Sequence, residues 1–474
     1  MIGGKPFAML IGGRAVAAGD TLDVINPATE ETIAQVPDCS RSQFDDAVAA
    51  ARSAFPEWRE TSIEHRREAL GQIAAALVDN AAELRDLLTA EQGKPQAAAQ
   101  GEIDATAFWI GEMAKYELPV TFSDEMPGLR SITTREPLGV VGAIVPWNFP
   151  LLLASWKICP ALLAGNTLVL KPAPTTPLAT LRWAEYISPN LPAGVMNVVT
   201  GGDQLGPWMT AHDGIDKISF TGSTATGKRV MESAAGNLKR MTLELGGNDA
   251  AIVLDDVDVE AIAEPLFWAA FTNSGQVCVA AKRIYVHESI YDDMLAALAH
   301  IARNVQVGNG DSEGVALGPV QNRAQYKRVR DLLSEARATG LTLVEGASVS
   351  ENKGFFVPVT LVDDPPESAS VVQEEAFGPV VPLMRYRDLD EVIAKANDSP
   401  YGLAGSVWSS DVERARTVAQ RLETGTVWIN SAQNLTPYAA FAGHKASGFG
   451  TEQGLDGLLE YTVPKTIHVP GEGA

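Results

Sequence analysis

The chain has 474 residues, of which 46% are hydrophobic and 20% are charged, and it carries a formal net charge of −22. A chain of this length exceeds a single hydrophobic core, so two or three domains are expected. The negative charge argues against nucleic acid or an anionic membrane as a partner, because both bind basic surfaces. The sequence has neither a long apolar run nor an uninterrupted N-terminal apolar stretch, which predicts a cytoplasmic protein without a membrane span or signal peptide.

The cysteines and histidines form no pattern of a disulfide framework or metal site. Cys39, Cys159 and Cys278 are odd in number and far apart, so they make no CxxC motif. The six histidines include no HExxH or comparable ligand spacing. We therefore predict no metal site.

The first part of the chain is predicted to be helical. Apolar residues recur at helical spacings over 42–100, in a segment rich in Ala, Leu, Arg and Glu, and the pattern continues over 102–116. A polar, proline-containing stretch over 118–129 then leads into 130–136, whose alternating pattern indicates an exposed strand.

From residue 138 onward, predicted strands alternate with predicted helices. The strands are 140–145, 167–171, 195–200, 217–220 and 241–245. The helices are 150–163, 177–187, 202–212 and 223–235. This alternation predicts an α/β fold, with a parallel sheet covered by helices on both faces.

A second α/β series begins after Gly247. Its predicted strands are 251–254, 284–287, 341–344, 355–361, 380–386, 403–408 and 425–430. Its predicted helices are 259–272, 290–305, 322–338, 388–397 and 411–422. The tail over 459–469 alternates like a strand and could not be stable alone.

Three motifs together supply a thiol, a carboxylate and an amide. Cys278 lies in the run NSGQVCV, Glu244 in ELGG and Asn148 in PWNFP. Taken singly, each has a plainer interpretation as a buried cysteine, a solvent-facing strand end or an Asx-turn. Taken together, they are the parts of an acyl-transfer site.

Three further motifs are typical of a dinucleotide site. Gly222 and Ser223, in FTGSTATGK, lie between a strand and a helix, where backbone N–H groups can meet a phosphate. Lys171, in KPAP, ends a strand of the same sheet and could reach a ribose, and Glu375, in EEAFGP, could bind a sugar diol. The first motif is neither GxGxxG nor a P-loop, and a plain helix cap, a solvated lysine and an acidic turn stay possible.

The order PWNFP, KPAP, FTGSTATGK, ELGG, GQVC, EEAFGP resembles the aldehyde dehydrogenase superfamily over essentially the full chain. The resemblance implies a Rossmann-type cofactor domain (1–116 and 136–244), an α/β catalytic domain (245–454) and a small β oligomerisation element (117–135 and 455–474). It also implies a homodimer or homotetramer.

The resemblance further implies oxidation of an aldehyde through a thiohemiacetal and a thioester on Cys278. Asn148 and the Cys278 N–H would hold the oxyanion, and Glu244 would activate the hydrolytic water. Members that transfer the acyl group to CoA lack this glutamate, so its presence favours hydrolysis. The implied cofactor contacts are Trp147, Lys171, Gly222, Ser223, Glu375 and Phe377.

Two positions depart from the family pattern. Pro174 stands where many NAD-preferring members have a glutamate that grips the ribose 2′-OH, so NAD is expected and NADP stays open. The late segment Gly450-Thr451-Glu452 stands where members often have GRE, so a salt bridge of that arginine is expected to be absent.

The implied substrate pocket is apolar and contains no basic residue. Its residues by analogy are Phe149, Trp156, Phe271, Val277, Val279 and Phe441. A neutral aliphatic or aromatic aldehyde is therefore the expected substrate. A non-catalytic protein that retains the fold and a thiol esterase stay as alternatives, and absence of dinucleotide binding would favour either of them.

Overall fold

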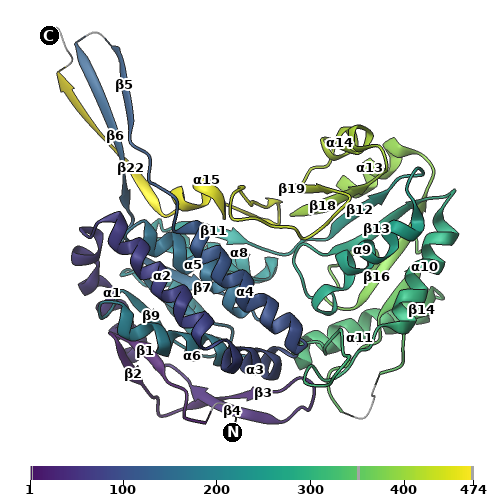
Figure 1. Cartoon of the computed structure of the whole chain (residues 1–474), viewed down its shortest axis with the longest axis horizontal. Coiled ribbons are helices and arrows are strands. Elements are labelled where there is room, and N and C mark those ends of the chain that lie inside the picture. The colour runs from purple at the N-terminus through teal and green to yellow at the C-terminus, as the bar shows by residue number, and fades with distance from the viewer. Residues whose placement is uncertain (1, 3, 127, 350–352, 471–474) are drawn as a thin grey trace.

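Two sheets with helices on both faces make up the body of the molecule, and a narrow sheet projects from one end (Figure 1). The structure is a computed structural model that describes residues 2, 4–126, 128–349 and 353–470. The domain ranges expected from the sequence also contain residues 1, 3, 127, 350–352 and 471–474, which lie outside the described residues.

The first sheet has the strand order β2-β1-β9-β8-β7-β10-β11-β21. Its strands are β1 (Met9–Ile11), β2 (Arg14–Val16), β7 (Val140–Ile144), β8 (Thr167–Lys171), β9 (Met196–Val198), β10 (Lys217–Thr221), β11 (Arg240–Glu244) and β21 (Gly448–Phe449). The five central strands β9, β8, β7, β10 and β11 pair in parallel. Strands β1, β2 and β21 pair antiparallel at the two edges. In chain order the parallel strands lie third, second, first, fourth and fifth, which is a Rossmann-type order and confirms the predicted fold class.

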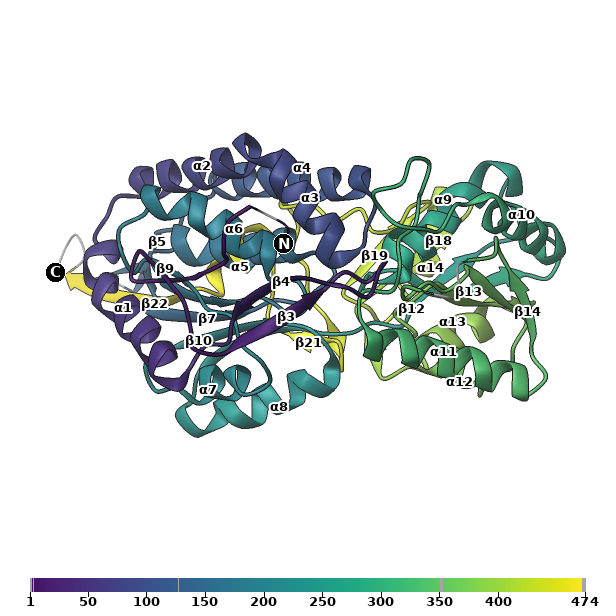
Figure 2. The ribbon, with the colours of Figure 1, turned by 90° about the horizontal axis from the view of Figure 1, so that it is seen from below.

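Helices cover both faces of this sheet (Figure 2). Helices α1, α7 and α8 pack on one face, α5 and α6 pack on the other, and α2, α3 and α4 form a further layer over α5 and α6. Their bounds are α1 (Arg41–Arg59), α2 (Ile63–Asp79), α3 (Ala81–Gln92), α4 (Gln96–Met113), α5 (Pro150–Leu163), α6 (Leu178–Ile187), α7 (Leu205–Ala211) and α8 (Thr224–Ala234). Short 3₁₀ turns follow α6 and α8, at η1 (Ser188–Asn190) and η2 (Ala235–Asn237).

The second sheet has the order β14-β15-β16-β13-β12-β18-β19. Its strands are β12 (Asp249–Val253), β13 (Ala281–His287), β14 (Thr342–Glu345), β15 (Thr360–Asp363), β16 (Val380–Tyr386), β18 (Ala404–Trp408) and β19 (Thr426–Ile429). Helices α9 (Val259–Phe271) and α10 (Tyr291–Asn304) cover one face. The other face is covered by α11 (Arg323–Ala338), α12 (Ser370–Gln373), α13 (Leu389–Asn397) and α14 (Val412–Ala419).

The projecting sheet, called the arm below, consists of β5 (Thr121–Met126), β6 (Leu129–Pro137) and β22 (Thr462–Pro470). Strand β22 pairs antiparallel with β6 along its whole length, so the end of the described chain lies at the tip of the arm (Figure 1). Helix α15 (Gly454–Leu459) precedes β22 and contacts α5. Two further hairpins are formed by β3 (Thr21–Ile25) with β4 (Thr32–Pro37), and by β17 (Tyr401–Gly402) with β20 (His444–Lys445).

Several predicted elements differ from those observed. The helical region 42–100 is divided among α1 to α4, because Ser62 caps α2, and Gly93 ends α3 in a left-handed conformation with φ 93°. The strand predicted over 355–361 begins only at Thr360, and the stretch 118–129 contains β5. The early strands β1 to β4 were not predicted, because they are short and are stabilised by pairing with distant segments.

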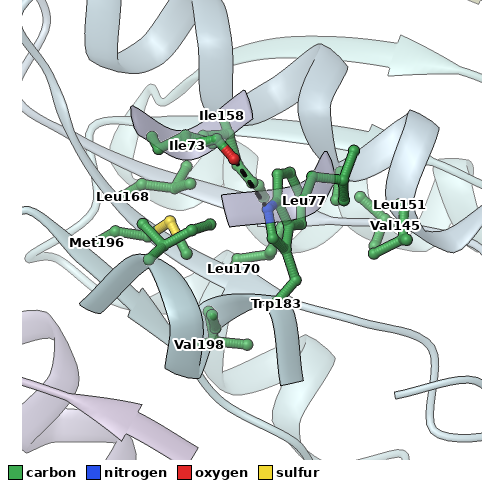
Figure 3. Packing of buried hydrophobic residues seen from close by; sticks show 14 of the residues in the cluster. Ile73, Leu77, Val145, Leu151, Ile158, Leu168, Leu170, Trp183, Met196 and Val198 are labelled. Carbon is green, nitrogen blue, oxygen red and sulfur yellow. Dashed lines mark hydrogen bonds between the residues drawn. The ribbon is translucent and has the colours of Figure 1, made fainter. Parts of the chain in front are cut away.

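The core between β7–β9 and the helices above them is closely packed (Figure 3). Trp183 of α6 is fully buried there, and its indole nitrogen donates a hydrogen bond of 3.2 Å to the carbonyl oxygen of Ile73 in α2. Strand side chains of Leu168, Leu170 and Val198 belong to the same cluster. Because every residue of β7 and β8 is buried, these strands form a rigid base for the residues at their carboxyl ends.

Candidate active site

Four polar residues stand at the carboxyl ends of the parallel strands of the first sheet or directly after them. Lys171 ends β8, Thr221 ends β10 and Glu244 ends β11, while Asn148 lies in the turn that follows β7. Neighbouring strand ends are in register, with Thr221 opposite Glu244. In open α/β sheets this edge is where ligands bind.

Cys278 lies in a loop held by an unusual turn. Asn273, Ser274 and Gly275 have successive φ values of 52°, 58° and 72°, so the chain makes a left-handed turn after α9. A Cβ at Gly275 would stand 2.2 Å from the carbonyl oxygen of Gly378, so a glycine is needed there. The Ser274 hydroxyl donates a 2.7 Å hydrogen bond to the Gly318 oxygen, which further fixes the approach to the thiol.

Asn148 lies against this thiol loop. Its side-chain nitrogen donates a 3.0 Å hydrogen bond to the carbonyl oxygen of Gln276, two residues before Cys278. An amide nitrogen carries two hydrogens, so one N–H remains for another acceptor. The residue is buried, and Pro146 and Pro150 restrict the turn in which it lies. This is the environment of a preorganised oxyanion donor.

Glu244 is a buried carboxylate, and neither of its oxygens has a hydrogen-bond partner among the described residues. Burial raises the pKa of this carboxyl well above its ordinary value; Glu452 raises it further, whereas Lys157 lowers it. Lys157 and Glu452 are themselves buried and form an ion pair. A carboxyl group with an elevated pKa is suited to accept a proton near neutral pH.

Burial raises the pKa of the Cys278 thiol to about 12, and the carboxylates of Asp249, Glu244 and Glu375 raise it as well. Lys282 acts in the opposite direction and lowers it. Its ammonium group donates to the Cys278 carbonyl oxygen at 2.6 Å and lies 3.2 Å from Glu375. The resting thiol is therefore protonated at neutral pH, so a base has to remove its proton before it can act as a nucleophile.

A cleft of about 250 Å³ connects the two sheets at this point. It is lined by residues that follow β7, β10 and β11 and by residues that precede β13 and β16. Of the predicted site residues, those in the lining are Trp147, Asn148, Gly222, Ser223, Cys278, Glu375 and Phe377. Lys171 and Glu244 are not part of this lining. Glu244 is buried at the end of β11, next to the lining residue Leu245, and Lys171 is buried at the end of β8, opposite Ile144, where burial lowers its pKa to about 8.

The cleft has the groups that a dinucleotide needs. Ser223 caps α8, and the first residues of this helix, Thr224 and Ala225, line the cleft. The Thr221 hydroxyl is buried there without a partner among the described residues. The rings of Trp147 and Phe377 meet edge to face, with their centres 5.3 Å apart. A helix N-terminus, an unpartnered hydroxyl and a carboxylate at Glu375 fit a pyrophosphate and ribose hydroxyls.

Cys278 also packs against an apolar cluster. Its buried members are Leu153, Trp156, Val277, Val279, Ala280, Leu403, Ala404 and Phe441, and its partly buried members include Trp109, Phe149, Trp428 and Leu435. Trp109 stacks on Trp156 at 6.0 Å, and its indole nitrogen donates to Gln453 at 2.9 Å. The thiol therefore faces an aromatic, water-poor environment on one side.

The comparisons with known proteins agree with this geometry. The model of the Aldehyde dehydrogenase family matches residues 15–467. A probable aldehyde dehydrogenase of a Pseudomonas species is 44% identical over 97% of this chain and 94% of its own length. The chain belongs to the aldehyde dehydrogenase family.

Other relatives support the same assignment. The chloroplastic betaine aldehyde dehydrogenase of Beta vulgaris is 40% identical over 94% of this chain and 92% of its own length. The NAD⁺ complex of the aldehyde dehydrogenase from Bacillus cereus is similar over 98% of this chain and 97% of that chain, with a TM-score of 0.96 at 37% identity.

One residue expected in the pocket of this aldehyde dehydrogenase lies elsewhere. Phe271 is fully buried in the core between α9 and the second sheet, where its ring lies 4.8 Å from that of Phe267. It is not part of the cluster around Cys278. The other expected pocket residues, Phe149, Trp156, Val277, Val279 and Phe441, do belong to that cluster.

Some polar residues of the site were not identified from the sequence. Lys157 is the one charged residue in the otherwise apolar helix α5, which is a usable signal for a buried functional or paired group. Gln325 and Lys282 gave no such signal. Glu452 follows Thr451, which stands where family members often have an arginine, and Glu452 forms an ion pair with Lys157.

The structure offers no clustered metal ligands and no membrane helix in the part that it describes. No group of three or more His, Cys, Asp or Glu side chains there is arranged to hold a metal ion. None of the helices within the described ranges is long and apolar enough to cross a bilayer.

Proposed function

We propose that this aldehyde dehydrogenase oxidises a neutral aliphatic or aromatic aldehyde to the carboxylic acid, with NAD⁺ as cofactor and Cys278 as nucleophile. The observation that carries the proposal is the pairing of the Cys278 thiol with the Asn148 amide held beside its loop, both of which line one cleft. The unpartnered carboxylate of Glu244 is buried at the end of β11, directly before the lining residues Leu245 and Gly246. These groups supply the nucleophile, the oxyanion donor and the base of an acyl-enzyme reaction.

The first half of the reaction forms an acyl-enzyme. Cys278 loses its proton to Glu244, the unpartnered carboxylate at the end of β11, and Glu244 releases this proton to solvent before the second half of the reaction. The sulfur then forms a bond to the carbonyl carbon, and the negative charge moves to the carbonyl oxygen, where Asn148 and the Cys278 N–H donate hydrogen bonds. A bound nicotinamide dinucleotide supplies the acceptor for the hydride that leaves this carbon. The product on Cys278 is a thioester.

The second half of the reaction releases the acid. Glu244 takes a proton from water as the water oxygen bonds to the thioester carbon, and the Cys278 thiolate leaves when the carbonyl re-forms. An aldehyde, a water molecule and an oxidised dinucleotide thus give an acid, a proton and a reduced dinucleotide. An unpartnered buried carboxylate favours this hydrolysis, because nothing else in the described residues competes for its oxygens.

The cleft and its flanking residues support a dinucleotide as cofactor. Ser223 and the N-terminus of α8 would bind the pyrophosphate, Lys171 the adenine ribose and Glu375 the nicotinamide ribose, with Trp147, Gly222 and Phe377 lining the same cleft. Pro174 offers no carboxylate to repel a 2′-phosphate, so NADP⁺ is a second acceptable cofactor. Titration of the protein with each dinucleotide, followed by tryptophan fluorescence, gives the preference directly.

The substrate class follows from the cluster beside the thiol. Its members are apolar or aromatic, and the Lys94 ammonium that stands over the Phe149 ring is already paired with Glu102. The stacked rings of Trp109 and Trp156 also suit a cationic aldehyde, in keeping with the name of the Beta vulgaris relative. A neutral aldehyde remains the first proposal because burying a charged group costs more than burying an apolar one.

A panel of aldehydes tests both parts of the proposal. The rate of dinucleotide reduction would be measured with hexanal, benzaldehyde, betaine aldehyde and succinic semialdehyde, with Cys278→Ala as the control. We expect the neutral aldehydes to have the highest kcat/KM and the control to be inactive. A preference for betaine aldehyde would replace the neutral class by a cationic one. A preference for succinic semialdehyde would rule out both the neutral and the cationic assignment.

The third part of the chain is proposed to assemble subunits. We infer that residues 1–116 and 136–244 bind the cofactor, that 245–454 carry the catalytic thiol, and that 117–135 with 455–474 form the contact of a homodimer or homotetramer. The arm supports the last assignment, because it leaves the body of the molecule and exposes apolar side chains.

A further inference from the structure

A buried ion pair lies behind the turn that carries Asn148. Lys94 follows the end of α3 and Glu102 lies in α4, and both side chains are almost completely inaccessible to water. The ammonium of Lys94 donates to the Glu102 carboxylate at 2.5 Å. A pair in this position is costly to bury, so its retention calls for a function that an apolar pair could not perform.

The other contacts of the Lys94 ammonium in the described residues are with the Asn148 turn. Its ammonium donates a 3.0 Å hydrogen bond to the main-chain oxygen of Asn148 and stands 4.0 Å from the centre of the Phe149 ring. The three donors of the ammonium are thus directed to a carboxylate, a carbonyl and an aromatic face. Lys94 therefore fixes the backbone that follows the Asn148 Cα.

Glu102 holds the segment that follows this turn, at the start of α5. Helix α5 begins at Pro150 without a side-chain cap of its own, and Glu102 accepts hydrogen bonds from the backbone N–H groups of Leu151 at 2.9 Å and Leu152 at 3.3 Å. A carboxylate at a helix N-terminus is favoured by the helix dipole. Glu102 thus joins the Lys94 ammonium to the first turn of α5.

We propose that Lys94 and Glu102 are positioning residues that hold the side-chain amide of Asn148 where an oxyanion forms. This role rests on the proposed function, in which Asn148 stabilises the charge on the carbonyl oxygen. The amide is then fixed by the hydrogen bond of its own nitrogen to Gln276 and by the clamp on its main-chain oxygen, which also accepts from the Asn273 side chain at 3.2 Å. Small displacements of an oxyanion donor cost large factors in rate, so such a clamp has a kinetic consequence.

A double-mutant cycle with Asn148→Ala tests the clamp. The paired variant Lys94→Met/Glu102→Gln removes both charges together, so no unpaired charge is left buried, and the Gln oxygen can still accept from the start of α5. The measured quantity is the single-turnover rate of dinucleotide reduction in the full-length protein. We expect the paired variant to lose about 10- to 100-fold in the natural background and less than about twofold in the Asn148→Ala background.

Two controls separate positioning from general damage. Alkylation of Cys278 by iodoacetamide needs no oxyanion donor, so its rate in the paired variant should stay within about twofold of that of the unmodified protein. Glu91→Gln is the matched control, because Glu91 is also a buried carboxylate that caps a helix, accepting from Leu178 and Ala179 at the start of α6. Within the described residues the side-chain hydrogen bonds of Glu91 are to the start of α6 and not to the Asn148 turn, so its variant should keep the single-turnover rate of the unmodified protein.

Each other outcome overturns the role of the clamp. An equal loss in both backgrounds would mean that Lys94 and Glu102 act independently of Asn148, and a parallel fall in alkylation would place their effect on the thiol loop. No loss in the natural background would mean that the clamp does not matter for the rate. Absence of any aldehyde-dependent reduction by the unmodified protein would instead overturn the proposed function, and the clamp with it.

Discussion

Glu244 is a base whose environment determines its protonation. Both of its oxygens are unpartnered within the described residues, and burial together with Glu452 raises its pKa. Replacing it by Gln keeps the shape and removes the base. We expect Glu244→Gln to lower the steady-state rate by about 10²- to 10⁴-fold while a first turnover of dinucleotide reduction, slower than in the unmodified protein, remains observable.

The measurement for Glu244→Gln is the time course of dinucleotide reduction at enzyme concentrations high enough to see one turnover. A burst close to one equivalent of active sites, followed by a slow phase, would mean that hydrolysis has become limiting. Loss of the burst together with the slow phase would show that the thioester cannot form without Glu244, which contradicts the expectation that hydrolysis limits this variant.

Lys282 affects the titration of the nucleophile. The charged groups that act on Cys278 are Lys282, Asp249, Glu244 and Glu375, and of these Lys282 opposes the rise in the thiol pKa. Its positive charge stabilises the thiolate, so removing the charge must raise the pKa. We expect Lys282→Met to move the pH dependence of Cys278 alkylation to higher pH, measured as the iodoacetamide rate across a pH series.

A charge-retaining variant separates this effect from packing. Lys282→Arg keeps a cation near the Cys278 carbonyl and Glu375, so its alkylation profile should lie closer to that of the natural protein than to that of Lys282→Met. Two coincident profiles for Lys282→Met and the natural protein would show that the charge has no influence on the thiol.

Residues of the site could be predicted where a local motif carries them. Asn148 and Cys278 were predicted because their motifs, PWNFP and NSGQVCV, occur together with ELGG, whereas each motif alone had a plainer interpretation. The pair Lys157 and Glu452 could not be found in this way, because the two residues are 295 positions apart and their contact depends on the completed fold. Phe271 was misplaced because an apolar residue near a nucleophile can face the core as readily as the substrate.

Helix α8 combines a structural cap with a proposed phosphate site. The Ser223 hydroxyl accepts from the backbone N–H of Thr226 at 3.3 Å, so it satisfies one of the free donors at the start of the helix. We expect Ser223→Ala to destabilise the protein by ~1 kcal/mol and also to weaken dinucleotide binding. Thermal unfolding and a dinucleotide titration measure the two effects separately.

A cap of the same geometry elsewhere provides the control. Ser62 caps α2 by accepting from the His65 backbone N–H at 3.2 Å, and it is not part of the cleft lining. Ser62→Ala should therefore have a similar effect on unfolding and leave the dinucleotide affinity unchanged. Equal affinities for all three proteins would remove Ser223 from the proposed cofactor site.

At the level of elements, the sequence predicted the parallel strands better than their edges. Strands β7 and β8 are buried throughout and appear as continuous apolar runs between helices. Strand β21 was missed because it has two residues and exists through its antiparallel pairing with β11. The breaks between α1 and α4 had local signals, Ser62 and Gly93, that the helical periodicity outweighed.

The arm exposes an apolar row in an otherwise highly charged molecule. Phe122 of β5, Ile132 of β6 and Ile467 of β22 are in register across the arm, so they share one face, and Phe122 and Ile467 are 58% and 51% exposed. Such a row on a projecting sheet is typical of a surface that another subunit covers. We expect Phe122→Asp/Ile467→Asp to convert a dimer or tetramer into monomers, measured by light scattering after size exclusion.

Val412→Asp is the matched control for this prediction. Val412 is 48% exposed at the start of α14, on the second sheet and not on the arm, so the same change in charge there should leave the molar mass unaltered. A natural protein that is already monomeric would contradict the assignment of the arm to assembly. A double variant that remains an oligomer would move the subunit contact elsewhere on the molecule.

Because two of the three cysteines are buried, thiol labelling can count the competent active sites. Cys39 and Cys159 are buried, whereas Cys278 is partly accessible at the cleft, so accessibility and not pKa distinguishes the three thiols. A thiol reagent applied to the folded protein should thus incorporate one label per chain and abolish turnover in proportion. Label stoichiometry in any preparation then reports the fraction of competent sites, so that rates of variants can be expressed per functional centre instead of per milligram of protein.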